Sequence, residues 1–97
     1  MARERERAKV LEPNGRTVVL TDDAWDHIRL EHRDMSRFER AIMETITHPD
    51  EWQPDVQPSR ERYFARGKGP TRWLRVVVDF SGERGTVVTA FGQDNEP

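Results

Sequence analysis

The sequence contains no cysteine, so it offers no disulfide, no thiolate metal ligand and no cysteine nucleophile. It also lacks any apolar run of about 18 residues, the length of a membrane-spanning helix. The basic residues at its N-terminus precede no apolar segment of the kind found in a signal peptide. We therefore expect a soluble, cytoplasmic protein that does not contact a membrane and whose stability comes from packing alone.

The chain is short, and 97 residues leave room for one modest core. This length predicts a single α+β domain over residues 1–97, with residues 1–5 and 94–97 flexible. Internal repeats and a dividing linker are both absent from the sequence.

Net positive charge is confined to one segment. The formal net charge is -2, yet residues 60–75 hold six arginines and lysines against one acid, Glu61, for a local charge of +5. A basic surface on an otherwise acidic protein suits a site for one phosphate or a short strand. Solvated edge strands produce a similar alternation of charges, which is the structural alternative.

The first third of the chain predicts a β-hairpin and a helix. Strand-like residues 7–11 and 16–20 flank Asn14-Gly15, a strong hairpin turn signal. Thr21 is suited to cap a helix that begins with two aspartates and runs to about His32.

A second helix is expected after a capping box formed by Ser36 and Glu39. Pro49 stops that helix, and residues 50–58 are expected to form an extended connector. Three strands then follow, at residues 61–66, 73–80 and 86–91. The predicted fold is an N-terminal β-hairpin, two helices and a three-stranded antiparallel segment, which together form one antiparallel sheet with the helices on one face. Alternation places Leu74, Val76, Val78 and Phe80 on the core side.

Two histidines on the first predicted helix are candidates for proton transfer near neutral pH. His27 and His32 are five positions apart, roughly 140° around a helix, so a shared metal ion is not expected. His32 falls on the same side as Trp25 and Ile28. The structural alternative for each histidine is a packing role.

Arginines on the later strands are candidates for binding phosphate, because a guanidinium donates two parallel hydrogen bonds and stays charged. Arg62 and Arg75, with Tyr63 and Thr89, could bind an RNA backbone and polarise a 2′-hydroxyl. Cleavage of this kind needs no cofactor, because the nucleophile belongs to the substrate. Tyr63 and Phe64 could stack on a base, or alternatively pack in the core. Further substrate contacts are expected from Arg60, Tyr63, Arg66 and Lys68.

Five segments, in this order and spacing, resemble the barnase/EndoU/colicin/RelE-like nuclease superfamily, in particular its small phage and bacterial domains. They are WDHIRLEH, ITHPDEW, RERYFAR, LRVVVDF and VVTAF, and the similarity extends over Val18–Phe91. The resemblance implies two helices packed against a curved antiparallel sheet, and a ribonuclease toxin paired with an antitoxin or immunity protein. The family's helix often continues as H-P-E, where this sequence has His32-Arg33-Asp34. The active groups implied are His27, His32, Arg62, Tyr63, Arg75 and Thr89.

The sequence thus predicts a metal-independent RNA endonuclease with catalytic residues His27, His32, Arg62, Arg75 and Thr89 and with no cofactor. A non-catalytic domain that binds protein or nucleic acid through the same basic strands is the second interpretation. A structural partner whose sheet edge pairs with another chain is the third.

Overall fold

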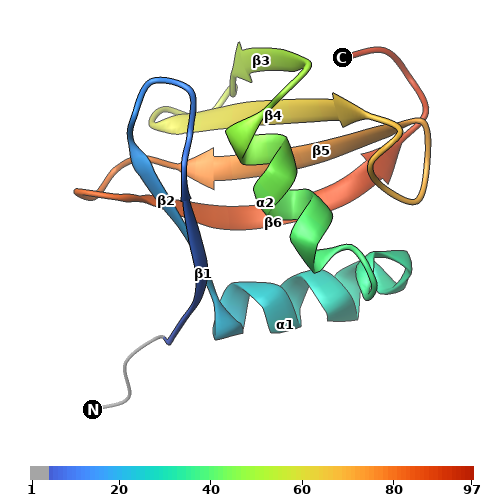
Figure 1. Cartoon of the computed structure of the whole chain (residues 1–97), viewed down its shortest axis with the longest axis horizontal. Helices are drawn as coiled ribbons and strands as arrows, with labels where there is room; N and C mark the ends of the chain where they lie inside the picture. The colour runs from blue at the N-terminus through green and yellow to red at the C-terminus, as the bar shows by residue number, and fades with distance from the viewer. Residues whose placement is uncertain (1–4) are drawn as a thin grey trace.

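A computed structural model describes residues 5–97, as two short α-helices, one 3₁₀ turn and six strands (Figure 1). The expected flexibility of residues 1–5 falls almost wholly outside the described residues. In chain order the elements are β1 (Glu6–Leu11), β2 (Thr17–Thr21), α1 (Asp22–Glu31), η1 (Arg33–Met35), α2 (Glu39–Thr47), β3 (Glu51–Pro54), β4 (Arg60–Arg66), β5 (Trp73–Asp79) and β6 (Gly85–Gln93).

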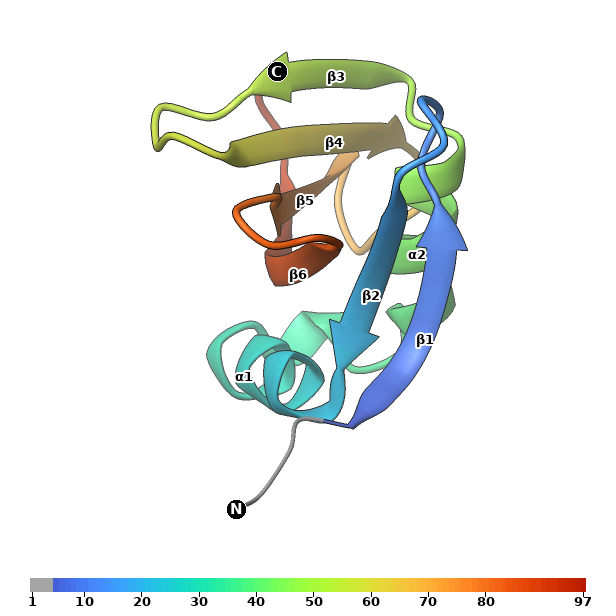
Figure 2. The same cartoon turned by 90° about the vertical axis from the view of Figure 1, so that its left-hand side faces the viewer.

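The strands form one mixed sheet in the order β1-β2-β6-β5-β4-β3. The α+β class is confirmed, but the prediction of a wholly antiparallel sheet is wrong, because β2 and β6 run parallel through the pairs Val18↔Gly85 and Val19↔Thr86. Side-chain alternation specifies the two faces of a strand but not its neighbour, so this pairing left no signal in the sequence. The sheet curves strongly, and β1 and β2 lie at a steep angle to β3 and β4 (Figure 2).

A sixth strand, β3, replaces part of the predicted connector. Its residues pair with β4 through Trp52↔Tyr63 and Pro54↔Glu61, among others. Proline is tolerated in an edge strand because no further strand needs its missing N–H. The prolines that argued for a connector are therefore compatible with the edge position that β3 occupies.

The first turn and the first helix form as predicted. Gly15 has a φ of 85°, a left-handed value that favours glycine, and its N–H donates to the Glu12 carbonyl at 2.8 Å. The Thr21 hydroxyl accepts a hydrogen bond from the Ala24 N–H at 3.1 Å and caps α1. The hairpin therefore leads directly into the helix.

The predicted capping box at Ser36 is wrong. Ser36 ends the η1 turn, its N–H donates to the Arg33 carbonyl, and α2 begins at Glu39 without any side-chain cap. Two tertiary features compete with the local signal. Met35 is fully buried, and the Glu39 carboxylate forms an ion pair with Arg7 of β1, in which Arg7 Nε lies 2.6 Å from Glu39 Oε2. Packing thus decides where the second helix begins.

Both helices contribute to one core on a single face of the sheet. In Figure 1, α2 crosses in front of β4, β5 and β6, and α1 runs below β6. In the part of the chain that the structure describes, no helix has the length and apolar character needed to cross a membrane. As predicted, the core side of β5 is formed by Leu74, Val76 and Val78, all fully buried, and Phe80 packs against the cluster.

Candidate functional site on the open face of the sheet

The face of β4, β5 and β6 that points away from the core, here called the open face, collects three of the predicted catalytic residues. The register aligns one residue from each strand in a row, and two neighbouring rows hold the candidates. These rows are Phe64↔Arg75↔Phe91 and Arg62↔Val77↔Thr89. Arg62 and Arg75 are therefore diagonal neighbours, with the Thr89 hydroxyl in the adjoining row.

Arg75 forms no ion pair with any other residue of the described range 5–97. Its guanidinium carbon lies 5.8 Å from the ring centroid of Phe64 and 5.3 Å from that of Phe91. Among residues 5–97, its Nε is buried without a hydrogen-bond partner, and Nη1 lies 3.5 Å from the Gln93 Oε1. Burial, followed by repulsion from Arg62, lowers the pKa of Arg75. An anion bound at Arg75 would relieve both penalties.

His32 joins this site from the end of α1. It terminates the helix, with its N–H donating to the Ile28 carbonyl at 2.8 Å, and its ring stacks on Phe91 with centroids 5.1 Å apart. Arg75 contacts the same phenyl ring. The imidazole from the helix and the guanidinium from the sheet therefore share one aromatic neighbour, Phe91.

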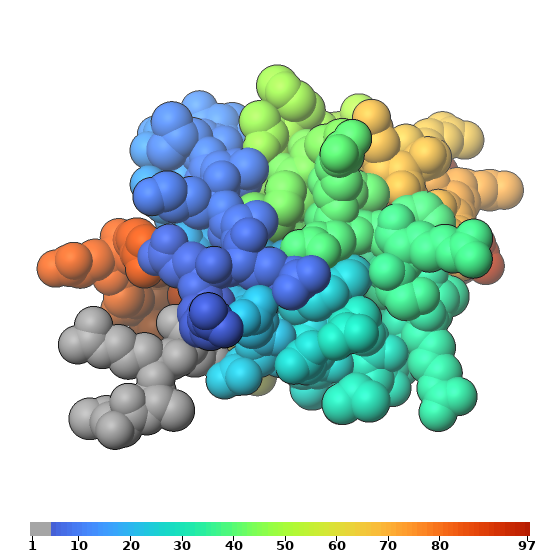
Figure 3. Space-filling model, turned by 60° about the horizontal axis from the view of Figure 1, so that its bottom comes forward, coloured from blue at the N-terminus to red at the C-terminus, as the bar shows by residue number. Residues whose placement is uncertain are grey.

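His27 is not part of this arrangement. Its side chain is 52% exposed, and its Nε2 lies 3.6 Å from the Glu31 carboxylate one turn later on α1. The outer surface of α1 lies at the bottom of the molecule, beside β1 (Figure 3). We therefore retain His32 and set His27 aside.

Arg62 lies on the open face but already has an anionic partner. Its Nε donates to the Asp55 Oδ1 at 2.5 Å, and the Asp55 side chain is only 9% exposed. The hydrogen bond from Arg62 lowers the pKa of Asp55. Arg62 is thus electrostatically compensated, unlike Arg75.

The three other basic residues that were predicted to contact substrate lie in different settings. Arg60 pairs with Asp79 at 3.5 Å, at the far end of the open face. Lys68 pairs with Glu44 of α2 at 3.6 Å and so lies toward the helices. Arg66 is exposed, with its guanidinium carbon 5.8 Å from the centroid of the Trp73 ring. Ion pairs with Asp55, Asp79 and Glu44, which lie outside residues 60–75, compensate much of the local positive charge.

Tyr63 occupies the opposite face of the sheet and is fully buried. Its hydroxyl donates to the Glu12 Oε2 at 3.1 Å, and burial together with nearby carboxylates raises its pKa. The ring is therefore unavailable to stack on a base. Phe64 does lie on the open face, but it is 1% exposed beneath Arg75, which leaves Phe91 and His32 as the accessible rings.

A buried polar cluster around Glu12 was not predicted. The Glu12 carboxylate accepts hydrogen bonds from the N–H groups of Asn14 and Arg16, from the Arg16 guanidinium and from Tyr63. Arg16 also forms a two-bond ion pair with Glu61, at 2.6 and 2.9 Å. The one available signal was an acid two residues before Asn14-Gly15, where it can accept from turn N–H groups.

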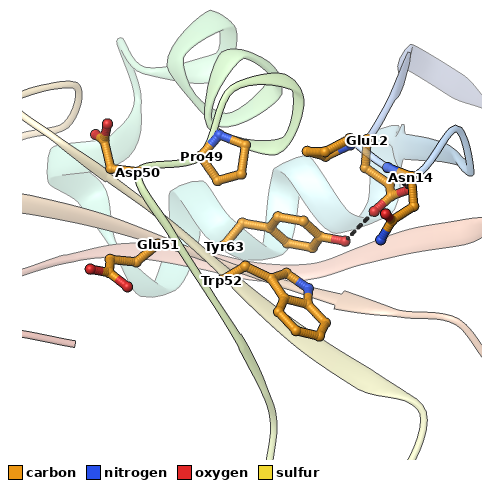
Figure 4. A pocket seen from close by; sticks show the side chains of 8 residues that line it. Glu12, Asn14, Pro49, Asp50, Glu51, Trp52 and Tyr63 are labelled. Carbon is orange, nitrogen blue, oxygen red and sulfur yellow. Dashed lines mark hydrogen bonds between the residues drawn. The ribbon is translucent and has the colours of Figure 1, made fainter.

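A cavity of about 330 Å³ adjoins this cluster, with Trp52 and Tyr63 side by side along it (Figure 4). Both oxygens of Glu12 are already hydrogen-bonded, so the cluster presents no free carboxylate there. The Trp52 indole N–H is likewise committed, donating to Glu61 at 2.9 Å. We interpret the cluster as the anchor that fixes the β1–β2 turn to β4.

Within residues 5–97, no three histidine, aspartate or glutamate side chains are grouped so that they could hold a metal ion. No protein-family model, curated protein or solved structure matches the chain. The chemistry of the open face is therefore the basis for inferring function. It offers an uncompensated guanidinium, an imidazole and a hydroxyl.

Proposed function

We propose that the protein is an RNA endonuclease whose site is the open face around Arg75, with His32 as the proton carrier. The observation that carries this proposal is the contact of both side chains with Phe91. Both an imidazole, a side chain suited to proton transfer, and a guanidinium that forms no ion pair within residues 5–97 lie against this ring. The resemblance of the sequence to ribonuclease domains points in the same direction.

The proposed reaction is an internal transesterification. The substrate 2′-oxygen attacks the adjacent phosphorus as His32 takes its proton, and the bond from phosphorus to the 5′-oxygen breaks. The imidazolium then returns a proton to the leaving 5′-oxygen, which yields a 2′,3′-cyclic phosphate and a free 5′-hydroxyl. Negative charge on the phosphoryl oxygens increases in the transition state, and Arg75 stabilises it by charge-assisted hydrogen bonds. In this proposal Thr89, in the row next to Arg75, adds a hydroxyl donor.

The proposed substrate is single-stranded RNA. Unpaired bases can stack on accessible rings, and Phe91 and His32 supply these at the edge of the open face. An RNA target places the proposed activity in the cytoplasm. A toxin-like role, with an antitoxin or immunity protein that covers Arg75, is part of the same proposal.

A second candidate function is RNA binding without cleavage. Two observations favour it: the open face holds one imidazole where acid and base catalysis commonly use two groups, and the Arg62 guanidinium is occupied by Asp55. In this case RNA would bind with strong salt dependence and remain intact.

The test is cleavage of a 5′-labelled single-stranded RNA in the presence of EDTA, followed on a denaturing gel. His32→Phe retains a ring to stack on Phe91 but cannot carry a proton, and Arg75→Gln keeps a shorter polar side chain but loses the charge. We expect both variants to lose at least about 100-fold in rate, in line with the loss of one acid–base group. The matched control His27→Phe should cleave as the unmodified protein does. Equal cleavage by all four proteins, or no cleavage by any, would contradict the proposal.

A further inference from the structure

Asp55 is fixed on the open face by its own loop. It follows the last residue of β3, and its N–H donates to the Arg60 carbonyl at 2.9 Å. Its two carboxylate oxygens have different partners: Oδ1 accepts from Arg62 at 2.5 Å, and Oδ2 accepts from the Gln57 N–H at 3.2 Å. The carboxylate is therefore held in place from both sides.

The charges of the open face largely cancel in pairs. Arg62 is compensated by Asp55, and Arg60 by Asp79. In the described chain, Arg75 forms no ion pair, and it lies in the central row between Phe64 and Phe91. The center of the face therefore presents one net positive charge, with the Asp55 carboxylate and the Arg62 guanidinium next to it.

A single positive charge matches an internal phosphodiester better than it matches a terminal phosphate. An internal phosphodiester carries one negative charge, whereas a terminal phosphate monoester carries about -1.5 to -2 at pH 7. The second charge would require a second free guanidinium. Two arginines of β4, Arg62 and Arg66, are diagonal neighbours of Arg75. The Arg66 guanidinium lies over the Trp73 ring at the end of the strand, whereas Arg62 acts on the charge of Arg75 and is occupied by Asp55.

We propose that Asp55 is a specificity-determining residue: by neutralising Arg62, it makes the Arg75 site accept internal phosphodiesters and disfavour terminal phosphates. This inference rests on the proposed RNA-binding role of the open face. Asp55 acts in two ways. It occupies the Arg62 guanidinium that a dianionic phosphate would need, and its own negative charge repels that phosphate. Removal of the carboxylate would free Arg62 to join Arg75 in a two-guanidinium phosphate site.

The experiment uses two uncleavable 2′-O-methyl trinucleotides, labelled at the 5′ end, that differ only in a 3′-hydroxyl or a 3′-phosphate. Binding to the full chain is measured by fluorescence anisotropy. In the unmodified protein we expect the two affinities to agree within about twofold. In Asp55→Asn we expect tighter binding of both and a preference of at least about tenfold for the 3′-phosphate. Asp55→Glu, which retains the charge, should restore the behaviour of the unmodified protein.

The matched control is Asp79→Asn. It removes the same charge from the same face but lies four residues along β5 from Arg75, about 13 Å away, beyond the screening length of physiological salt. It should leave the preference between the two probes unchanged. An Asp55→Asn protein without the new preference, or an Asp79→Asn protein with an equal one, would overturn the inference.

Failure of the inference and failure of the proposed function give different results. Arg75→Gln should abolish binding of both probes. If it does so while Asp55→Asn shows no new preference, the Asp55 inference is wrong and the RNA site stands. Both proposals are wrong if the unmodified protein binds neither probe. They are also wrong if Arg75→Gln binds both probes with the affinity of the unmodified protein.

Discussion

The imidazole of His32 stacks on the phenyl ring of Phe91 at a centroid separation of 5.1 Å and an interplanar angle of 29°. This contact joins the end of α1 to the last strand of the sheet. Because Arg75 lies 5.3 Å from the same ring, Phe91 positions both groups of the proposed site without itself taking part in proton transfer.

Phe91→Leu should therefore impair cleavage more than folding. Loss of the flat ring lets His32 and Arg75 shift, and a misplacement of about 1 Å can cost up to roughly 100-fold in rate. We expect the cleavage rate to fall at least tenfold while the urea unfolding midpoint changes little. Trp52→Leu, which alters a half-exposed aromatic on β3, is the control and should not affect cleavage.

Arg75 should contribute to the salt dependence of RNA binding, whereas Arg60 should contribute little because it is already paired with Asp79. For single-stranded nucleic acid each phosphate contact adds about 0.7 to the slope of log affinity against log salt. Arg75→Gln should lower the magnitude of the slope by about that amount, and Arg60→Gln by much less. Equal changes in the two variants would argue against a special role for Arg75.

The Tyr63 hydroxyl should stabilise the fold but not affect RNA binding, since it lies on the core side of the sheet and donates to Glu12. Tyr63→Phe removes this hydrogen bond and leaves the other three donors to Glu12 in place. We expect a loss of about 1 kcal/mol in the free energy of unfolding, measured with urea. A loss of RNA affinity would show that the two faces are coupled.

Stability should fall at acid pH because of the carboxylates that Arg16 binds. Hydrogen bonds from Arg16 lower the pKa of Glu61; burial tends to raise the pKa of Glu12, but its hydrogen bonds from Arg16 and Tyr63 lower it overall. A lowered pKa in the folded state means that the unfolded state binds protons more readily. The stabilisation is therefore complete above the ordinary glutamate value of 4.5 and is lost as the pH falls below it.

Urea unfolding between pH 6 and pH 3 measures this loss, with Arg16→Met as the comparison. That variant should be less stable at neutral pH and show a shallower decline with acid. An unchanged slope would mean that other carboxylates dominate the acid response.

Gly85 lies where β6 pairs with β2, and it has no space for a side chain. A Cβ at this position would approach Phe80 Cε1 to 2.6 Å and Val78 Cγ1 to 2.9 Å, and Val78 is fully buried. Gly85→Ala should cost about 1–3 kcal/mol in unfolding free energy. Gly82→Ala is the control, since the nearest atom to its added Cβ is 3.9 Å away.

Local signals predicted the elements that local chemistry determines. The Asn14-Gly15 turn, the Thr21 cap and the core side of β5 each depend on residues within a few positions of one another. The Ser36 capping box failed because burial of Met35 and the ion pair of Glu39 with Arg7 act over long distances in sequence. The parallel pairing of β2 with β6 was not predicted for the same reason, because the two strands are far apart in the sequence.

The residues of the candidate site likewise divide into those that the sequence predicted and those that depend on long-range partners. The sequence grouped Arg62, Arg75 and Thr89 with Tyr63 as candidates, and the register places the first three on one face and Tyr63 on the other. The sequence could not show that Asp55 would neutralise Arg62 or that Tyr63 would bind Glu12, because both partners come from other segments. Charge counted along the sequence therefore overestimated the positive charge of the surface.

The position of β6 between β2 and β5 has a consequence for how the chain folds during synthesis. The hairpin is synthesised before the other strands of this sheet, whereas β6, which joins the hairpin to them, is synthesised after them. Until β6 arrives, β2 has an open edge and α1 lacks the strand against which it packs. Completion of the last strand is then the event that closes the whole sheet, and with it brings Phe91 beneath His32.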